Sequence, residues 1–120
     1  MTDVCGIIVT YEERGPLLEK VVNRLIEEGV SKVIIVDNNS GNKSKQIMKD
    51  LVNKHSDKIR IIHLKESIES AGGFKMGLQA FLKENCKFAW LLEDDNVPEK
   101  GALDKLVKYN NDLSKNTQRL

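Results

Sequence analysis

Apolar residues along the chain alternate between short continuous runs and runs spaced at helical periodicity. Each continuous run has strand length, and a strand that is apolar throughout is typical of a sheet covered on both faces. The spaced runs place apolar side chains on one face of a helix. Strands are therefore predicted at residues 4–10, 32–36, 59–64 and 87–92, and helices at about 16–28, 47–52, 74–82 and 99–109, before a frayed tail over 110–120.

Strands that alternate with helices favour parallel βαβ units with right-handed crossovers. The expected fold class is α/β, with three α/β/α layers around a mostly parallel sheet. The third helix is expected to turn Phe74, Leu78, Phe81 and Leu82 inward, after a turn over residues 67–73. The lysines of the second helix, among them Lys45, are interpreted as a solvated face.

Polar and acidic residues gather directly after each predicted strand. In open α/β sheets ligands bind outside the carboxyl ends of the strands, so these residues form one candidate site. They converge only if the first strand lies between the second and the fourth, which predicts the strand order 3-2-1-4. The segments are Tyr11-Glu12-Glu13, Asp37-Asn38-Asn39, Ser70-Ala71-Gly72-Gly73 and Glu93-Asp94-Asp95.

Composition and charge narrow the class of protein. At 120 residues, 40% of them hydrophobic, the chain is one domain or part of one. A net charge of +1 provides no broad basic field for nucleic acid or an anionic membrane. No stretch is suited to spanning a bilayer, and the first residues are not a signal peptide. We expect a cytoplasmic protein without a nucleic-acid partner, associated with the inner face of the membrane only peripherally if at all.

The two cysteines lack a metal or redox spacing, which favours free thiols in a reducing compartment. Cys5 opens the first strand and Cys86 precedes the fourth. The two would lie near each other if those strands are neighbours.

The acidic triplet after the fourth strand is the strongest chemical signal. Adjacent negative charges repel each other, so folding alone gives little reason to place them there. Carboxylate oxygens at the end of a rigid strand suit Mg²⁺ or Mn²⁺, which is usually held by one or two carboxylates and by substrate phosphates. Glu93 and Asp95 are the candidate metal ligands. The structural alternative is a helix N-cap at Asp95 or Asn96.

Other candidates have equally simple structural explanations. Asp37 fits either an Asx-turn or a carboxylate that accepts a hydrogen bond from a nucleotide base or ribose. Gly72 and Gly73 fit either a flexible turn or a backbone that approaches a donor at a helix N-terminus. His63 has no partner at metal-ligand spacing and is interpreted as structural or surface-exposed.

Four segments in order resemble the amino-terminal half of a family-two glycosyltransferase of the GT-A fold, the nucleotide-diphospho-sugar transferase type. Residues 8–11 resemble its opening strand, usually followed by Asn-Arg; residues 36–40 resemble its base-binding strand end, and residues 92–98 its acidic metal motif. Residues 66–74 resemble the Glu-Asn-Leu-Gly-Gly-Ala-Gly-Gly-Phe segment of the galactofuranosyl- and rhamnosyltransferase branch.

The resemblance implies a metal-dependent, inverting glycosyltransferase. It would move a sugar, with galactofuranose and rhamnose as candidates, from a UDP- or dTDP-sugar to a glycan or lipid-linked acceptor. Mg²⁺ or Mn²⁺ would neutralise the departing diphosphate. The implied nucleotide-binding residues are Thr10, Tyr11, Asp37 and Asp94, the metal ligands Asp95 and Glu93, and the donor-sugar loop Gly72 and Gly73.

Departures from the family pattern limit this inference. Glu12 stands at the family's Asn, and Ser67, Glu69 and Ser70 at its Asn and two glycines, which puts the donor sugar in question. By the resemblance, residues 1–110 are the nucleotide-sugar-binding half, and 111–120 are a tail or the start of an acceptor half. The catalytic base is then expected beyond residue 120, and the 120 residues alone are expected to transfer no sugar.

Two alternatives of other classes remain open at this stage. A phospho-receiver signalling domain has similar length and element order, and Glu12-Glu13 resembles its acidic pair, but no Asp directly follows the third strand. A nucleotide-binding module without catalysis is the other.

Overall fold

The computed structural model describes residues 3–118, and side chains as far as residue 111. Strands and helices alternate throughout, as the sequence predicts. The elements are β1 (Val4–Thr10), α1 (Gly15–Glu28), β2 (Lys32–Asp37), α2 (Asn42–Lys54), β3 (Ile59–His63), α3 (Ser70–Phe81), β4 (Phe88–Glu93) and α4 (Ala102–Gln118).

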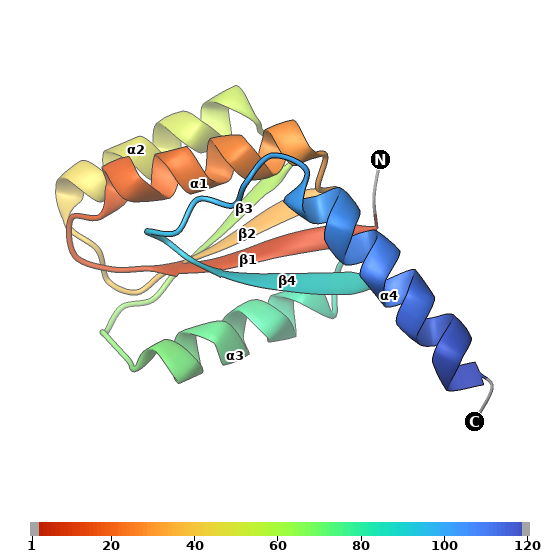
Figure 1. Ribbon diagram of the computed structural model, residues 1–120. Coiled ribbons are helices and arrows are strands. Elements are labelled where there is room, and N and C mark those ends of the chain that lie inside the picture. Colours follow the sequence, from red (N-terminus) through yellow and green to blue (C-terminus); the bar gives the residue numbers. More distant parts are fainter. Residues whose placement is uncertain (1–2, 119–120) are drawn as a thin grey trace.

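The four strands form one parallel sheet in the order β3-β2-β1-β4, which confirms the predicted order. Helices α1 and α2 cover one face and α3 covers the other, so the molecule has three layers (Figure 1). The carboxyl ends of all four strands lie at one edge, on the left in Figure 1. The polar segments after the strands are therefore brought to one side of the molecule.

The larger core lies between the sheet and α1 and α2. Ile8 and Ile35 point into it and Ile7 and Ile34 point to the opposite face, as the alternation of a strand requires. Helix α4 adds Leu103 to the larger core and then projects away from the sheet (Figure 1). No helix in residues 3–118 has the length and apolar character needed to cross a lipid bilayer.

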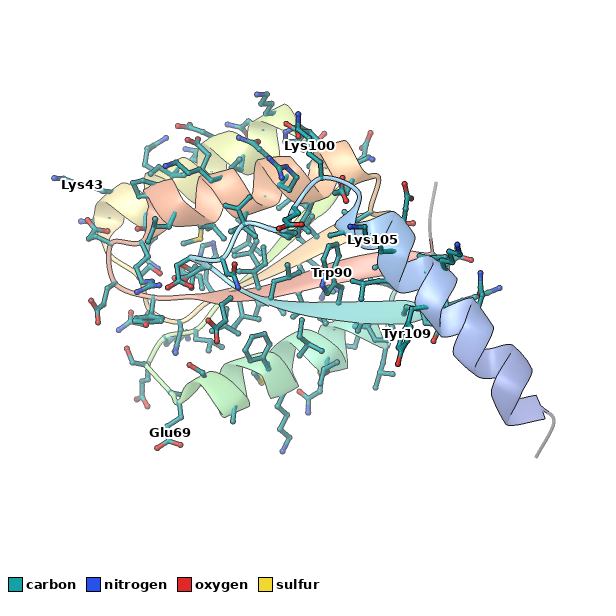
Figure 2. The ribbon with its side chains drawn as sticks, viewed as in Figure 1. Lys43, Glu69, Trp90, Lys100, Lys105 and Tyr109 are labelled. Atoms are coloured by element: carbon teal, nitrogen blue, oxygen red, sulfur yellow. A yellow bond between two sulfur atoms is a disulfide. The ribbon has the colours of Figure 1, made fainter. Side chains whose placement is uncertain are left out.

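Trp90 packs against the larger core, on the side of the sheet that α4 reaches (Figure 2). Together with Phe88, Leu106 and Tyr109 it lines an apolar hollow of about 260 Å³ between β4 and α4. The hollow is far along the sheet from the carboxyl ends of the strands.

Helix α3 meets the sheet through small residues, and Phe74 and Phe81 pack beside them as predicted. Gly73, Gly77 and Ala80 are buried, whereas Leu78 and Leu82 are 38% and 79% exposed, so the expected inward positions of these two leucines are wrong. A Cβ on Gly77 would lie 2.5 Å from Cγ2 of Ile7. The glycines therefore let the helix backbone approach β1 closely, which leaves no space for leucine at the contact.

The boundaries of α3 and α4 also differ from the prediction. α3 begins at Ser70, so the expected turn over 67–73 ends earlier and the two glycines lie in the first helical turns. α4 begins at Ala102 and runs to Gln118, where a frayed tail was expected. Glu28 fixes its start, since its two carboxylate oxygens accept hydrogen bonds from the backbone N–H groups of Gly101 (3.1 Å) and Leu103 (3.0 Å).

Cys5 and Cys86 form a disulfide with a Cα–Cα separation of 6.0 Å, so the expectation of free thiols is wrong. The predicted strand order already brings the two cysteines close together, and the structure shows them bonded. β4 lies beside β1, and the backbone N–H groups of Lys87 and Phe88 both donate to the carbonyl of Asp3. These bonds bring the segment before β4 next to the start of β1.

Candidate functional site

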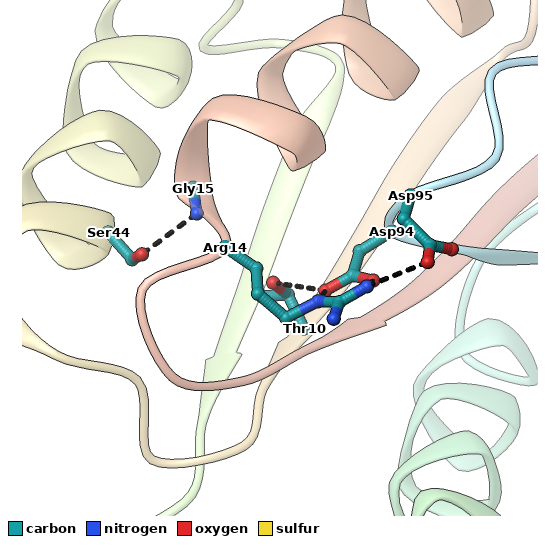
Figure 3. A network of polar contacts seen from close by, with 6 residues as sticks. All are labelled: Thr10, Arg14, Gly15, Ser44, Asp94 and Asp95. Atoms are coloured by element: carbon teal, nitrogen blue, oxygen red, sulfur yellow. Dashed lines mark hydrogen bonds and ion pairs between the residues drawn. The ribbon is translucent and has the colours of Figure 1, made fainter.

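Asp94 lies directly after β4 and is the centre of a polar network (Figure 3). It is 3% exposed. Its Oδ2 accepts hydrogen bonds from Thr10 Oγ1 and Arg14 Nε, both at 2.9 Å, and its Oδ1 accepts one from Arg14 Nη2 at 2.8 Å. Thr10 is the last residue of β1, the strand that pairs with β4. The network therefore joins the ends of two neighbouring strands.

Arg14 also reaches the next carboxylate. Its Nη2 lies 2.9 Å from Oδ2 of Asp95, and its guanidinium lies 4.8 Å from the centre of the Tyr11 ring. The hydrogen bond to Asp94 raises the pKa of Arg14, an effect that burial opposes in part. Folding therefore gives a reason for part of the acidic triplet, since the single positive charge of Arg14 contacts two of its three carboxylates.

Arg14 is a functional candidate that the sequence analysis does not single out, although it directly follows the polar segment after the first strand. The available signal was a basic residue after the first strand, opposite three acidic residues after the fourth. With the predicted strand order, these two segments are neighbours. Their separation of 80 positions in the chain hides this pairing from any local pattern.

The start of α2 holds the segment that carries Arg14. The backbone N–H of Gly15 donates to Ser44 Oγ at 2.9 Å, and the backbone N–H of Ser44 donates to Glu13 Oε1 at 3.1 Å. A Cβ on Gly15 would lie 2.9 Å from Cα of Ser44, so only glycine allows the two helix ends to approach this closely. The position of Arg14 is thus set by packing and not only by its ion pairs.

Asp37, the last residue of β2, forms a second network. It is fully buried, and its Oδ1 accepts the backbone N–H of Ser40 at 2.8 Å. Its Oδ2 lies 2.6 Å from Nζ of Lys45 and 2.6 Å from Nδ1 of His63. Burial raises the pKa of Asp37, but the bonds from Lys45, Ser40 and His63 outweigh it and lower the pKa to about 2. The expectation of a fully solvated lysine face is therefore wrong for Lys45.

Asn38 connects the end of β2 to the segment before α3. Its Nδ2 donates to the carbonyl of Ile68 at 2.5 Å, and its Oδ1 accepts the backbone N–H of Ile68 at 2.8 Å. An amide that pairs with both backbone groups of one residue acts as a two-point clamp. It holds this segment against the carboxyl end of the sheet.

Two adjoining hollows lie at this edge of the sheet, and both are lined by Tyr11 and Ser70. The smaller, of about 190 Å³, is bordered by the acidic triplet and Arg14. The larger, of about 450 Å³, is bordered by Asn38 and by backbone and side chains of the segments after β1 and before α3. Together they form one cleft, with Arg14 and the acidic triplet in the smaller part and two asparagines, Asn38 and Asn39, beside the acidic Glu12 and Glu69 in the larger part.

The structure brings most of the predicted site residues to this cleft. Tyr11, Glu93, Asp94 and Asp95 line it. Thr10 and Asp37 are buried behind it and do not line either hollow. Gly72 and Gly73 lie in α3, where Gly73 packs against Val9, and Ser70 and Phe74 line the cleft instead.

The donor set allows a test of the expected metal. Within the described residues, no three or more acidic, histidine or cysteine side chains converge on a point where they could hold a metal ion. Mg²⁺ in nucleotide sites, however, needs only one or two carboxylates besides the phosphates. Asp95, with its side chain 47% exposed, and the exposed Glu93 both border the smaller hollow and fit that requirement.

Comparison with known proteins identifies the family. The family model described as glycosyl transferase family 2 matches residues 5–116. The chain belongs to glycosyl transferase family 2. Its resemblance to the galactofuranosyl- and rhamnosyltransferase branch is a finer assignment and stays a prediction. No curated protein matches the chain in a sequence search.

Solved structures show the same fold at low sequence identity. S. aureus TarS 1–349 matches with a TM-score of 0.72 and 19% identity, over 93% of this chain and 33% of that chain. The same fragment in complex with UDP-GlcNAc matches with a TM-score of 0.72 and 17% identity, over 93% of this chain and 32% of that chain. S. aureus TarS matches with a TM-score of 0.69 and 19% identity, over 93% of this chain and 20% of that chain. The GT-A-type fold is thus confirmed, and this chain spans about a third of the length of TarS 1–349.

Proposed function

We propose that this chain is the donor-binding part of a glycosyltransferase and that its cleft binds a nucleoside diphosphate-sugar. The observation that carries the proposal is the cleft itself. It lies at the carboxyl ends of β1, β2 and β4 and joins a charged hollow to an amide-rich one through Tyr11 and Ser70. A nucleoside diphosphate can place its diphosphate in the hollow that Arg14 lines and its base and ribose in the hollow that the asparagines line.

In this proposal the base and ribose lie in the larger hollow. Tyr11 offers an aromatic face there, and Asn38 and Asn39 offer polar edges. The Asn38 clamp on Ile68 keeps the far wall of this hollow in place. The role of Asp37 as a direct partner of the base stays a prediction; its position behind the cleft favours a supporting role.

The diphosphate lies in the smaller hollow. Asp95 and Glu93 would hold Mg²⁺ or Mn²⁺ there, and the cation would neutralise charge on the departing diphosphate. Asp94 already accepts hydrogen bonds from Thr10 and Arg14, and it would position its neighbour Asp95 rather than ligate the metal. Support for UDP as the nucleotide comes from the TarS fragment that holds UDP-GlcNAc in the same fold.

The finer features of the reaction remain part of the proposal. They are a UDP or dTDP donor, galactofuranose or rhamnose as the sugar, a glycan or lipid-linked acceptor, and inversion at the anomeric carbon. Inverting transfer requires a base within hydrogen-bond reach of the acceptor hydroxyl. Of the carboxylates in the smaller hollow, Asp94 already has partners, and Glu93 and Asp95 have proposed metal roles. We therefore expect donor binding by these residues without sugar transfer.

Titration calorimetry with UDP tests the proposal. The chain should bind UDP more tightly with Mn²⁺ than with EDTA, and uridine only weakly under both conditions. Tyr11→Ala should weaken UDP binding, whereas Tyr109→Ala, on the apolar hollow beside α4, should leave it unchanged. Absence of UDP binding with Mn²⁺ would refute the proposal.

The sheet order argues against the phospho-receiver alternative. The flavodoxin-like order of receiver domains places β1 between β2 and β3, whereas here β1 lies between β2 and β4. A nucleotide-binding module without catalysis makes the same calorimetric prediction for these residues. A transfer assay on a protein that contains an acceptor site distinguishes it from an enzyme.

A further inference from the structure

Arg14 places its positive charge between the carboxylates of Asp94 and Asp95. Its guanidinium bonds Asp94 through two nitrogens and contacts Asp95 through one, and it lines the smaller hollow of the cleft. Its side chain is 26% exposed, so one part of it faces the carboxylates and another part is open to solvent. Within the described residues, Nη1 bonds neither carboxylate and has no hydrogen-bond or ion-pair partner.

The contacts of Arg14 with the two carboxylates are unequal. Asp94 is buried and makes a two-point bond, with Thr10 as a further donor. Bidentate charge-assisted bonds of this kind are the strong ones. Asp95 is half exposed and makes a single contact through Oδ2. Exposed ion pairs contribute little, so the contact with Asp95 can be exchanged while the pair with Asp94 is kept.

We propose that Arg14 serves the site in two ways. Without ligand, its guanidinium neutralises Asp95 in place of a divalent cation. With a nucleoside diphosphate bound, it releases Asp95 to the cation, stays on Asp94, and donates from Nη1 to a phosphate oxygen. This inference rests on the proposed function, since it assigns a residue to the diphosphate at the same cleft.

Two consequences follow from the competition for Asp95. Divalent cations alone bind weakly, because they must first displace the Arg14 guanidinium from Asp95. A nucleoside diphosphate removes this obstacle by offering Arg14 new acceptors. UDP and the metal therefore bind cooperatively, and the coupling runs in both directions.

The test compares Arg14→Gln, Arg14→Lys and the wild-type chain. Arg60→Gln is the matched control. Arg60 lies on β3, outside the cleft, and also pairs with a carboxylate, that of Glu84. Free Mn²⁺ is measured by electron paramagnetic resonance without nucleotide, and UDP affinity is measured in EDTA by calorimetry. Arg14→Gln should bind Mn²⁺ alone about fivefold more tightly and UDP in EDTA about tenfold more weakly. A residue that only maintains the fold would not strengthen metal binding when it is removed.

Arg14→Lys keeps the inference testable if the glutamine variant does not fold. Lysine retains the positive charge but lacks the second donor edge. It should bind Mn²⁺ alone like the wild type and still lose UDP affinity in EDTA. If every Arg14 variant that folds binds Mn²⁺ alone and UDP in EDTA like the wild type, the inference is wrong, although the proposed binding of UDP is unaffected. If the wild type itself binds no UDP with Mn²⁺, the proposed function fails instead.

Discussion

Asp37 and Asp94 are buried carboxylates at the ends of the two strands that flank β1, and they differ in where their basic partners lie. Asp37 is held by Lys45 from α2 and His63 from β3, both on the side away from the cleft. Asp94 is held by Arg14, which lines the cleft. A ligand in the cleft can therefore reach the network of Asp94 but not the partners of Asp37.

This difference separates two uses of the same residue type. A buried carboxylate needs compensating donors wherever it lies. When the donors lie away from the cleft, the network stabilises a loop, as Asp37 does through Ser40. When one donor also lines a cleft, that donor can bond the carboxylate and a ligand at the same time. The predictions below test this distinction, from the largest expected effect on stability to the smallest.

Asp94→Asn should cause the largest loss, about 3 kcal/mol in the free energy of unfolding. The substitution removes the charge that compensates Arg14 and weakens the link between β1 and β4. Urea unfolding measures the loss. Asp104→Asn, at an exposed position in α4, is the control and should leave stability unchanged. A loss no larger than that of the control would contradict the role assigned to this network.

Asp37→Asn should lower the free energy of unfolding at neutral pH by about 2 kcal/mol. Because the folded pKa of Asp37 is lowered to about 2, its contribution is present above the pKa of the unfolded chain and is lost as pH falls through about 2. The wild type should therefore lose stability between about pH 5 and pH 2, and the variant should lose less over that interval.

Nucleotide affinity of Asp37→Asn distinguishes a supporting role of Asp37 from direct contact with the base. If Asp37 acts only through the fold, UDP affinity measured at a temperature where the variant is folded should stay close to the wild-type value. Equal stability with a large loss of affinity for both UDP and uridine would instead make Asp37 a direct partner of the base.

Asp95→Asn should have the smallest effect on stability, below about 1 kcal/mol, because its single contact with Arg14 is half exposed. Its large effect should be on the metal dependence of UDP binding. UDP affinity should become the same in Mn²⁺ and in EDTA. A variant that keeps the full advantage of Mn²⁺ would remove Asp95 from the metal site.

The sequence predicts the strand order and the edge of the sheet that carries the site. Apolar runs specify strands, and Tyr11, Asp37 and Asp94 mark where the strands end. It does not predict the partner of Asp94, because the ion pair with Arg14 depends on two segments far apart in the chain. It predicts only part of the inner face of α3. Phe74 and Phe81 pack inward as expected, but glycines make the contact expected of the two leucines.

The central claim, that nucleotide and metal meet beside Asp95, is tested most directly by paramagnetic broadening of backbone amide signals in NMR. Mn²⁺ with UDP is compared with Mg²⁺ with UDP, and with Mn²⁺ alone. The account predicts that Mn²⁺ with UDP broadens the amides of Tyr11, Ser70 and Asp95 first, and those of Lys32 and Phe88 at the amino ends of the strands least. Mn²⁺ alone should broaden the same amides much less. Broadening centred on the amino ends of the strands or on α4, or broadening that UDP does not change, would contradict the account.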